Sequence, residues 1–329
     1  MTRSIQGASV AVVGAAGFLG SHLVEYLIEE RGCKVIGLDN LVAGRREYVH
    51  PKCEFYHIDI TGSEMDLAYL FLKHKVRFVL NYAAWPYIPD SFSRPLQVFN
   101  VNAFGAMKVI NAAQEAGVEA ILQVSSAEIY GEGQYKKGDS HEFTNINEDA
   151  SIAPHSTYGA SKAAIDAWIR VRWKEAKTPC IALRQFNCVG ERETHPYVVP
   201  EIITQLYQTG NRLSLGNDSV RDFLYAGDAV RSAVELLEKG DFGEVYNLGS
   251  EQGVRISKLA QMLSDIVGCG RVEITQDPAR VRPWEIWHLQ SDNRKINNTI
   301  SYRPKVSLEE AFKKTVDWYV GNGKKWSWE

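Results

Sequence analysis

The sequence predicts a doubly wound α/β fold, in which helices cover both faces of a parallel sheet. Short apolar runs rich in Val and Ile alternate with segments of helical periodicity, and a glycine-rich turn follows the first apolar run. Fully apolar strands separated by helices are typical of a parallel sheet buried on both sides. The 329 residues, 45% of them hydrophobic, are enough for one large core or two unequal ones.

The first half of the chain follows this alternation in order. An unbroken apolar run predicts the first strand within residues 9–15, and residues 21–30 have the apolar spacing of a helix. The same alternation continues with two more strands, a long helix and another strand, in residues 34–40, 77–84, 98–116 and 120–127.

The rhythm changes from about Arg184, where irregular segments surround helices predicted at residues 198–210 and 256–268. We therefore predict a first domain of residues 1–183 and a second, smaller α/β domain of residues 184–329, with some segments returning to the first. No linker-like stretch or fixed-period repeat separates them. The two domains should pack closely and share a cleft.

Composition narrows the classes of partner. The net charge of -3 and the pI near 6.3 provide no basic field for a nucleic acid. The N-terminal apolar stretch is broken by glycines and is too short to span a membrane, so we expect a cytoplasmic protein without a membrane partner. The 5 cysteines are odd in number and scattered, which argues against disulfides and against a metal site.

The motif "GAAGFLG" follows the first predicted strand and opens a helix. Gly14 suits a tight turn, Gly17 a close approach to a pyrophosphate, and Gly20 close packing of the helix. The start of the helix adds partial positive charge. A tight turn without a ligand is the alternative explanation of this motif alone.

Acidic residues at the ends of the next strands strengthen the interpretation. Asp39 lies about 20 residues beyond the glycines, where a carboxylate can accept hydrogen bonds from an adenosine ribose. Its charge would repel a ribose phosphate, which favours NAD over NADP, although Arg45 and Arg46 keep NADP as an alternative. Asp59 could accept from the adenine amino group or could be an ordinary loop acid.

Tyr158 and Lys162 form a Y-x-x-x-K motif with helical spacing, which places both side chains on one helix face. A nearby ammonium favours the phenolate form of tyrosine, whose free pKa is about 10, and would make it a general base. The same spacing also occurs by chance on solvated helix faces.

Together these motifs make the chain resemble the extended short-chain dehydrogenase/reductases, within the NAD-dependent nucleotide-sugar epimerase/dehydratase family that includes UDP-glucose 4-epimerase. The resemblance runs over nearly the whole chain, through "NYAA", "NVNAFGAMKVINAA", "SSAEIYG", "YGASK", "RQFNCVG", "VRDFLYAGDA" and "RPWEI". It implies a Rossmann domain and Ser126, Tyr158 and Lys162 as the catalytic triad. It also implies an NAD site made of Gly14, Gly17, Phe18, Leu19, Gly20, Asp39, Asn40, Asp59, Ile60, Ala83, Ala84, Asn102, Ser125 and Lys162.

The resemblance further implies that the second domain holds the nucleotide diphosphate. Asn187, Arg221 and Arg282 match positions that similar proteins use near the phosphates, and arginine binds phosphate oxygens with its forked guanidinium. Surface or interdomain ion pairs are the alternative for the arginines. The loop after "NYAA" departs from similar epimerases, since it lacks their lysine; its Trp85 and Tyr87 could wall the nicotinamide or sugar pocket, or belong to the core.

The role of Glu128 distinguishes an epimerase from a dehydratase. In an extended chain Ser126 and Glu128 would point the same way with α-carbons roughly 7 Å apart. A sugar 4,6-dehydratase needs a second base, which Glu128 could be, and an acid. Similar dehydratases often have a polar residue at the position of Ala127, which cannot donate a proton. Glu128 could also be a structural carboxylate bound to an amide or an arginine.

We therefore predict an NAD-dependent nucleotide-sugar 4-epimerase acting through Tyr158, with a UDP-hexose as the favoured substrate. The alternative is a 4,6-dehydratase or a related C4-oxidising enzyme, such as a decarboxylase, 4-dehydrogenase or 4-ketoreductase, that uses Glu128. A dinucleotide-sensing protein without turnover is a remote third possibility. A homodimer formed through the helices that begin near Pro95 and Tyr158 is expected from the resemblance.

Overall fold

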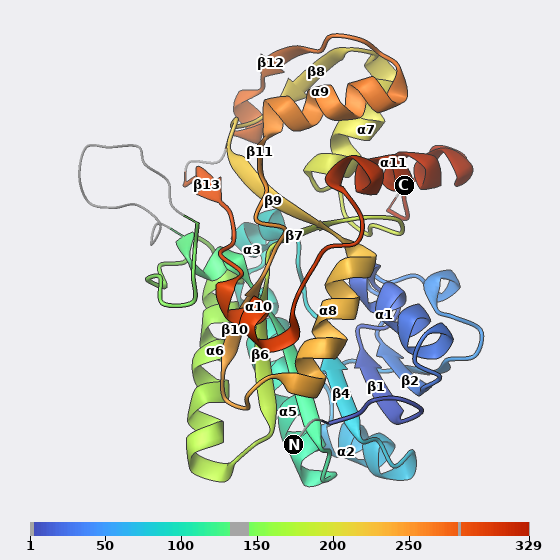
Figure 1. Cartoon of the computed structure of the whole chain (residues 1–329), viewed down its shortest axis with the longest axis vertical. Helices are drawn as coiled ribbons and strands as arrows, with labels where there is room; N and C mark the ends of the chain where they lie inside the picture. Colours follow the sequence, from blue (N-terminus) through green and yellow to red (C-terminus); the bar gives the residue numbers. More distant parts are fainter. Residues whose placement is uncertain (1–2, 132–144, 282–283, 329) are drawn as a thin grey trace.

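The computed structural model describes residues 3–131, 145–281 and 284–328. Its centre is a parallel sheet of seven strands in the order β10-β6-β5-β4-β1-β2-β3 (Figure 1). The predicted doubly wound parallel sheet is therefore confirmed. Its strands are β1 (Ser9–Val13), β2 (Lys34–Asp39), β3 (Glu54–His57), β4 (Phe78–Asn81), β5 (Ala120–Ser126), β6 (Cys180–Gln185) and β10 (Val245–Leu248).

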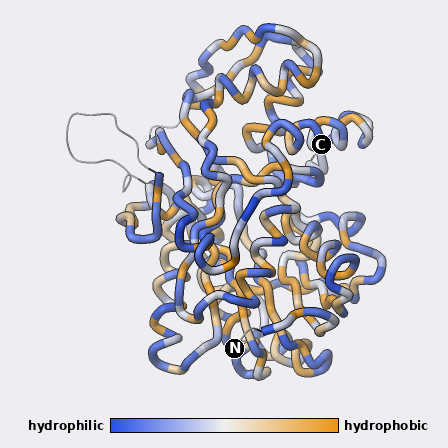
Figure 2. Tube along the Cα trace, viewed as in Figure 1, coloured by the Kyte–Doolittle hydropathy of each residue, from blue (hydrophilic) through white to orange (hydrophobic). Residues whose placement is uncertain are grey.

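Alternate residues of each strand face opposite layers of helices, which is why the strands read as continuous apolar runs. One face packs on α1 (Phe18–Glu29), α8 (Ala226–Lys239) and α10 (Arg294–Ile300). The other packs on α2 (Glu64–Lys73), α5 (Ala106–Glu115) and α6 (Thr157–Ala176). The strands of the large sheet run as mostly hydrophobic stretches between these helices (Figure 2).

The order of strands changes direction between β1 and β4, since β2 and β3 lie to one side and β5 and β6 to the other. Ligands of open α/β sheets bind at the carboxyl ends of the strands beside such a switch. The glycine-rich turn after β1 and the loop after β4 border this crevice, so the fold places the predicted cofactor motif where a ligand can bind.

The long helix predicted from Val98 to Ala116 is interrupted. It begins as α4 (Pro95–Phe99), passes through a π-helical turn, η2 (Asn100–Gly105), and continues as α5. A short helix, α3 (Ile88–Ser93), precedes it. π-helical turns within helices are frequent at functional sites, and this one contains the predicted site residue Asn102.

The chain beyond residue 184 divides between two locations. β10, α8 and α10 join the large sheet, whereas a four-stranded sheet and further helices form a separate core beyond the carboxyl ends of the large sheet (Figure 1). This second region contains β7 (Asn187–Val189), β8 (Arg212–Leu215), β9 (Val220–Tyr225), β11 (Gly253–Arg255), β12 (Glu273–Gln276), β13 (His288–Leu289), α7 (Val198–Thr209), α9 (Ile256–Val267) and α11 (Leu308–Gly321). The division at residues 183 and 184 stays a prediction.

Two further sequence features have a structural counterpart. A helix with the length and apolarity of a membrane span is not found in the described part of the chain. The 5 cysteines carry free thiols, and Cys33, Cys53 and Cys180 among them are buried. Their side chains therefore contribute to packing.

Candidate active site

The glycine-rich turn connects β1 to α1 and has two kinds of glycine. Gly14 has a φ of +83°, and a Cβ there would lie 2.7 Å from the backbone nitrogen of Ala83. A Cβ on Gly20 would lie 1.8 Å from the carbonyl oxygen of Gly14. The protein itself therefore requires both glycines, one for its backbone conformation and both for close packing.

Gly17 differs, because its φ is -79° and a Cβ there would meet only the Gly14 carbonyl at an ordinary 3.4 Å. Nothing in the described chain demands a glycine at this position. Gly17 caps α1, and the N–H groups of Phe18 and Leu19 follow in the first helical turn, where no helical carbonyl precedes them. An open, positively polarised helix start of this kind suits a pyrophosphate.

Asp39 ends β2 directly beside this turn. One carboxylate oxygen accepts the Ala16 N–H at 3.0 Å and the other accepts the Leu41 N–H at 2.8 Å. Burial raises the pKa of this carboxyl. Asp59 lies next to it across the sheet edge and accepts from the side-chain amide of Asn40 at 2.9 Å. The structure thus gathers these three predicted cofactor residues at neighbouring strand ends.

Arg45 and Arg46, which kept NADP as an alternative cofactor, make other contacts. The Arg45 guanidinium donates through Nε to the carbonyl of Ser327 at 2.9 Å, near the C-terminal end of the described chain. Arg46 stacks over the ring of Phe55, with its guanidinium carbon 4.8 Å from the ring centroid. Neither contact leaves the guanidinium directed at Asp39, which favours a cofactor without a ribose phosphate.

The loop after β4 completes this side of the crevice. Asn102 is fully buried in the π-helical turn, and its side-chain amide both accepts from the Trp85 N–H at 2.6 Å and donates to the Trp85 carbonyl at 3.1 Å. Asn102 therefore acts on the loop backbone. It fixes the path of Ala83 and Ala84, and Ala83 packs against Gly14. Ile60 packs against the same helical turn at Gly105.

The predicted triad meets at the carboxyl end of β5. Ser126 is the last residue of that strand, and its hydroxyl is hydrogen-bonded to the phenol of Tyr158. Tyr158 lies in the first turn of α6, whose start is fixed by Ser156, which accepts the Gly159 N–H at 3.0 Å. One helical turn further, the Lys162 ammonium lies 5.9 Å from the centroid of the Tyr158 ring and donates to the Val124 carbonyl at 3.0 Å.

The electrostatics of this cluster are dominated by burial. Burial raises the pKa of Tyr158 to about 12, the hydrogen bond with Ser126 opposes the rise, and the charge of Glu128 adds to it. Burial also lowers the pKa of Lys162 to about 8, against the effect of Asp166. The phenol therefore needs a further positive charge beside it to ionise readily near neutral pH.

The extended conformation predicted for Ser126 to Glu128 is wrong. The strand ends at Ser126, and residues Ala127–Ile129 form a 3-10 turn that Ser126 caps by accepting the Glu128 N–H at 3.2 Å. A hydroxyl at a strand end competes for backbone N–H groups and favours such a turn. The turn, and not strand alternation, sets the direction of Glu128.

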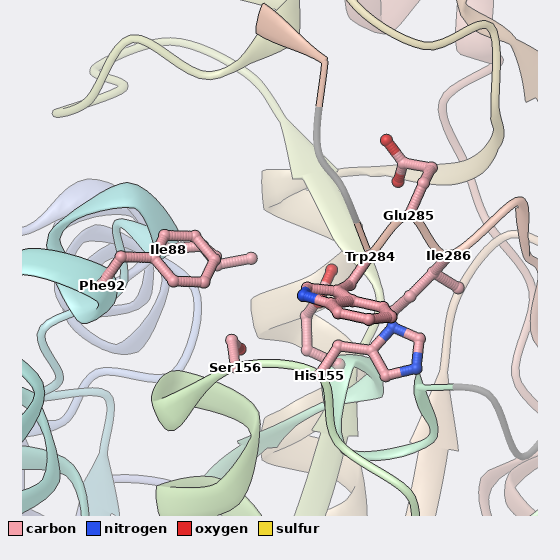
Figure 3. Close-up of a pocket in the computed structure, with 8 residues that line it drawn as sticks. Ile88, Phe92, His155, Ser156, Trp284, Glu285 and Ile286 are labelled. Carbon is pink, nitrogen blue, oxygen red and sulfur yellow. The ribbon is translucent and has the colours of Figure 1, made fainter.

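Glu128 nevertheless reaches a pocket next to the triad. Figure 3 shows Ile88 and Phe92 of α3 on one side, the rings of Trp284 and His155 together on the other, and Ser156 between the two sides. Apolar side chains thus contribute to both walls, and the Ser156 side chain lies in the space between them. The lining residues are Ile88, Phe92, Glu128, His155, Ser156, Trp284, Glu285 and Ile286.

The residues predicted near the phosphates are placed differently from one another. Arg221, on β9, is buried and forms an ion pair with Glu285 at 2.5 Å, while it also donates to the Ile286 carbonyl at 2.6 Å. It therefore holds the segment that carries Trp284. Asn187, on β7, donates to the Asp222 carbonyl at 3.4 Å. Arg282 lies outside the described residues.

Sequence reasoning missed a polar and aromatic cluster in the loop after β7. The Tyr87 and His195 rings stack with centroids 5.7 Å apart, and Tyr197 lies edge-on to Tyr87 at 6.1 Å. The charge of Tyr158 raises the pKa of Tyr197, after burial, so this cluster faces the triad. Burial lowers the pKa of His195 to about 4 and raises that of Glu193 well above its usual range. The run "ERETHPY" directly after "RQFNCVG" could have drawn attention to them.

Comparison with known proteins agrees with this geometry. A family profile described as "NAD dependent epimerase/dehydratase family" matches residues 10–249. The chain belongs to this family. It is therefore an NAD-dependent enzyme of the nucleotide-sugar epimerase/dehydratase group, as the sequence predicted.

Relatives of both activities are similarly close to this family member. The dTDP-D-glucose 4,6-dehydratase of Mus musculus is 30% identical over 96% of this chain and 90% of its own length. The UDP-glucose 4-epimerase of Thermotoga maritima, solved with UDP-glucose, matches with a TM-score of 0.86 and 28% identity over 95% and 99% of the two chains. The dTDP-glucose 4,6-dehydratase of Bacillus anthracis, solved with NAD, gives 0.83 and 25% over 97% and 98%.

The residues present fit NAD. Gly17 leaves open the helix start that a pyrophosphate needs, although no neighbour within the chain requires a glycine there. Asp39 retains lone pairs for a ribose beyond its two backbone bonds. The described residues hold no group of three potential metal ligands among His, Cys, Asp and Glu.

Proposed function

We propose that the enzyme is a nucleotide-sugar 4-epimerase, which inverts the hydroxyl configuration at C4 of the hexose. The single observation that carries this proposal is the composition of the β5 end. Ser126 is hydrogen-bonded to Tyr158, while Ala127, between Ser126 and Glu128, is buried and has no proton to give. The site therefore has the groups that remove a proton from the C4 hydroxyl. It lacks, at Ala127, a side chain that could donate the proton needed to expel water from the sugar.

The chain's own residues have distinct tasks in this proposal. Tyr158 takes the proton of the C4 hydroxyl and later gives it back, and Ser126 orients that hydroxyl through the same hydrogen bond. Lys162 supplies positive charge near the phenol. When bound, NAD supplies a hydride acceptor for C4, returns the hydride to the opposite face of the ketosugar, and carries a pyridinium charge that favours the phenolate.

The remaining predicted residues have supporting roles. Gly14, Gly17, Gly20 and Asp39 would hold the pyrophosphate and the adenosine ribose, and Asn102 would position the loop that covers the nicotinamide side. Asn187 and Arg221 would lie near the nucleotide diphosphate. For Arg221 this requires donors beyond those used by Glu285, and a guanidinium has five.

A 4,6-dehydratase is the second candidate, and Glu128 is the observation that favours it. Glu128 lines the pocket beside Ser156, close enough to Tyr158 for its charge to raise the phenol pKa. A carboxylate in that position could remove the C5 proton of a 4-ketosugar. Glu193 is buried, with neither carboxylate oxygen hydrogen-bonded within the described chain, and burial raises its pKa well above its usual range, so it would be the candidate acid of such a mechanism.

Product analysis separates the two candidates. The purified enzyme is incubated with UDP-, dTDP-, GDP- and CDP-hexoses, and products are measured by mass and by sugar configuration. Epimerisation leaves the mass unchanged, dehydration removes one water, and decarboxylation of a uronate removes carbon dioxide. Loss of water would overturn the first choice. A Glu128→Gln variant should keep most epimerase turnover, whereas it should abolish a dehydration that uses Glu128.

The finer partner assignments are part of the same proposal. A UDP-hexose is the favoured substrate, supported by the UDP-glucose bound in the Thermotoga maritima relative. The proposal includes a cytoplasmic location and a homodimer, and the homodimer is favoured by large apolar side chains exposed on α4, η2 and α6, namely Leu96, Phe104 and Val171. Sedimentation of the wild type beside a Leu96→Glu variant tests the dimer, which should dissociate in the variant.

A further inference from the structure

A buried row of charges extends behind Tyr158 into the protein. Tyr158, Lys162 and Asp166 follow one another at one-turn intervals, so they lie on a single face of α6. The Lys162 side chain is 2% exposed and Asp166 is 1% exposed. Arg184, on β6, is also 1% exposed and binds Asp166 through Nε at 2.8 Å. Three ionisable side chains, Lys162 of the triad and the pair of Asp166 and Arg184 behind it, thus lie in the interior.

Arg184 connects this row to the segment that carries Ser126 and Glu128. Its Nη1 donates to the Tyr130 hydroxyl at 2.8 Å, and Tyr130 donates to the side-chain carbonyl of Asn247 at 2.6 Å. Tyr130 closes the 3-10 turn that Ser126 caps. The same buried network therefore holds both halves of the triad, α6 through Asp166 and the β5 end through Tyr130.

The network compensates for part of the electrostatic cost of burying a charged Lys162. A lysine removed from water loses its charge unless a counter-charge compensates for the lost hydration. Burial lowers the pKa of Lys162 to about 8, and Asp166 is the one acid in the described chain whose charge is found to raise it. The single hydrogen bond that Lys162 donates, to the Val124 carbonyl at 3.0 Å, is to a neutral group. Removal of Asp166 would therefore lower the pKa of Lys162 further.

Other titratable groups on the elements packed against α6 do not replace Asp166. α4 and η2 carry no ionisable side chain, and neither does β5. Tyr158 itself and the thiol of Cys180 are neutral at pH 7, because burial raises both pKa values. The charged groups that remain are Glu128 of the 3-10 turn, Asp90 of α3 and Arg184 of β6.

We propose that Asp166, fixed by its ion pair with Arg184, is a positioning residue that keeps Lys162 protonated and oriented toward Tyr158. Arg184 balances the charge of Asp166 and prevents it from turning toward Lys162 as a closed, neutralised pair. The inference rests on the roles proposed for Tyr158 and Lys162, but it holds for either epimerisation or dehydration, since both begin with oxidation at C4.

The first experiment measures the pH profile of that oxidation in the holoenzyme. Reduction of bound NAD by the substrate sugar is followed by absorbance in the wild type and in Asp166→Asn. The alkaline limb of the profile reports loss of the Lys162 proton, so it should move to lower pH by about one unit or more in the variant. Asp166→Glu should restore most of the wild-type profile.

The matched control is Asp228→Asn. Asp228 is also a buried carboxylate in a helix, where it binds Arg231 at 2.7 Å and the backbone N–H groups of Lys305 and Val306. Its replacement should lower the unfolding temperature without moving the alkaline limb. A uniform loss of rate in Asp166→Asn with an unmoved limb would overturn the proposal, because a merely structural role predicts that result.

The second experiment reads the charge of Lys162 without turnover. The holoenzyme is labelled with 13C-lysine, the Lys162 signal is assigned with Lys162→Met, and its titration is followed by NMR. The wild-type signal should titrate near pH 8 and that of Asp166→Asn at lower pH. An uncharged Lys162 at pH 7 in the wild type, or equal titration in both proteins, would contradict the proposal.

The proposal can still be tested if Asp166→Asn does not fold. If Asp166→Asn leaves Arg184 buried without a partner and does not fold, Asp166→Asn/Arg184→Gln removes both charges together, which proteins tolerate better. The double variant should show the same lower titration of Lys162. The proposed function fails separately: if Tyr158→Phe still oxidised the sugar at the full rate, the base assignment would fall, whereas the titration of Lys162 would stand.

Discussion

The two sides of the catalytic crevice are built differently. On the dinucleotide side, the turn from Gly14 to Gly20 is a local motif, and Asp39 binds it through the Ala16 N–H. On the sugar side, Arg221 binds Glu285, 64 residues away in the sequence, and Tyr87 of the loop after β4 stacks on His195 of the loop after β7. The dinucleotide side is built on a local turn, which packs on Ala83, whereas the sugar side depends on side-chain contacts between distant segments.

This difference explains how the family can keep its cofactor and vary its reaction. The glycine turn tolerates little change, because Gly14 and Gly20 are in contact with backbone atoms. The sugar side depends on side chains such as Trp284 and Glu128, which can be replaced without altering the sheet. Tyr158 lies where the two sides meet.

The largest effect, a loss of turnover, is expected for a substitution of Tyr158. Tyr158→Phe removes the hydroxyl that takes the sugar proton, so turnover should fall by about 100- to 10,000-fold. Binding of NAD should persist, because no part of the glycine turn changes. Steady-state rates and a fluorescence titration of NAD check the two halves of this expectation; equal losses in both would show that the two sides are not separable.

The glycines of the turn should divide into two groups. Gly20→Ala places a methyl group 1.8 Å from the Gly14 carbonyl oxygen, so the variant should fold poorly or not at all. Gly17→Ala meets only an ordinary contact, so it should retain the wild-type unfolding temperature and bind NAD more weakly. Thermal unfolding with and without NAD distinguishes them. An unchanged affinity of Gly17→Ala for NAD would contradict the prediction that the pyrophosphate binds at this position.

Removal of a long-range ion pair on the sugar side should lower the free energy of unfolding more than removal of short-range hydrogen bonds on the dinucleotide side. Arg221→Met leaves Glu285 buried without its cation and should lower the free energy of unfolding by about 3–5 kcal/mol. Asn40→Ala, which removes two exposed hydrogen bonds, one to Asp59 and one from the Val42 N–H, should cost about 1 kcal/mol or less. Urea denaturation of both variants measures the contrast, and similar costs would contradict it.

The last prediction concerns the contact between the two sides, and it is a change with pH rather than a loss at neutral pH. His22 of α1 is buried against the Glu191 carbonyl, 2.9 Å from its Nε2, and burial lowers its pKa from 6.5 to about 3. The unfolded state therefore binds the proton first as pH falls. Stability from this group is complete above pH 6.5 and is lost from there down to about pH 3, with a slope of at most about 1.4 kcal/mol per pH unit.

His22→Gln keeps an N–H donor for the Glu191 carbonyl but cannot take up the proton. Its urea midpoint should therefore decline less between neutral and acidic pH than that of the wild type. Equal declines would assign the acid sensitivity to other groups, and the contact between α1 and the loop after β7 would then not depend on a neutral histidine.

Much of the dinucleotide side could be predicted from the sequence, because its information is local. Apolar runs identify the strands, and the glycines and Asp39 mark the strand ends, so the parallel fold and NAD are both confirmed. Tyr158 and Lys162 share a face of α6, as the helical period predicts, and their catalytic role stays a prediction. The extended path expected from Ser126 to Glu128 was wrong, because a capping hydroxyl, and not alternation, shapes that turn.

Only the tertiary structure decided which distant side chains surround the sugar. Arg184 and Asp166 are ordinary members of a strand and a helix in the sequence, and only the packing of β6 on α6 pairs them in the interior. The loop after β7 brings Tyr197 close enough to Tyr158 for the charge of that phenol to raise the Tyr197 pKa. Side-chain identity and local period determine where an element forms, whereas the burial that shifts a pKa and the partner that balances a charge arise from how the elements pack.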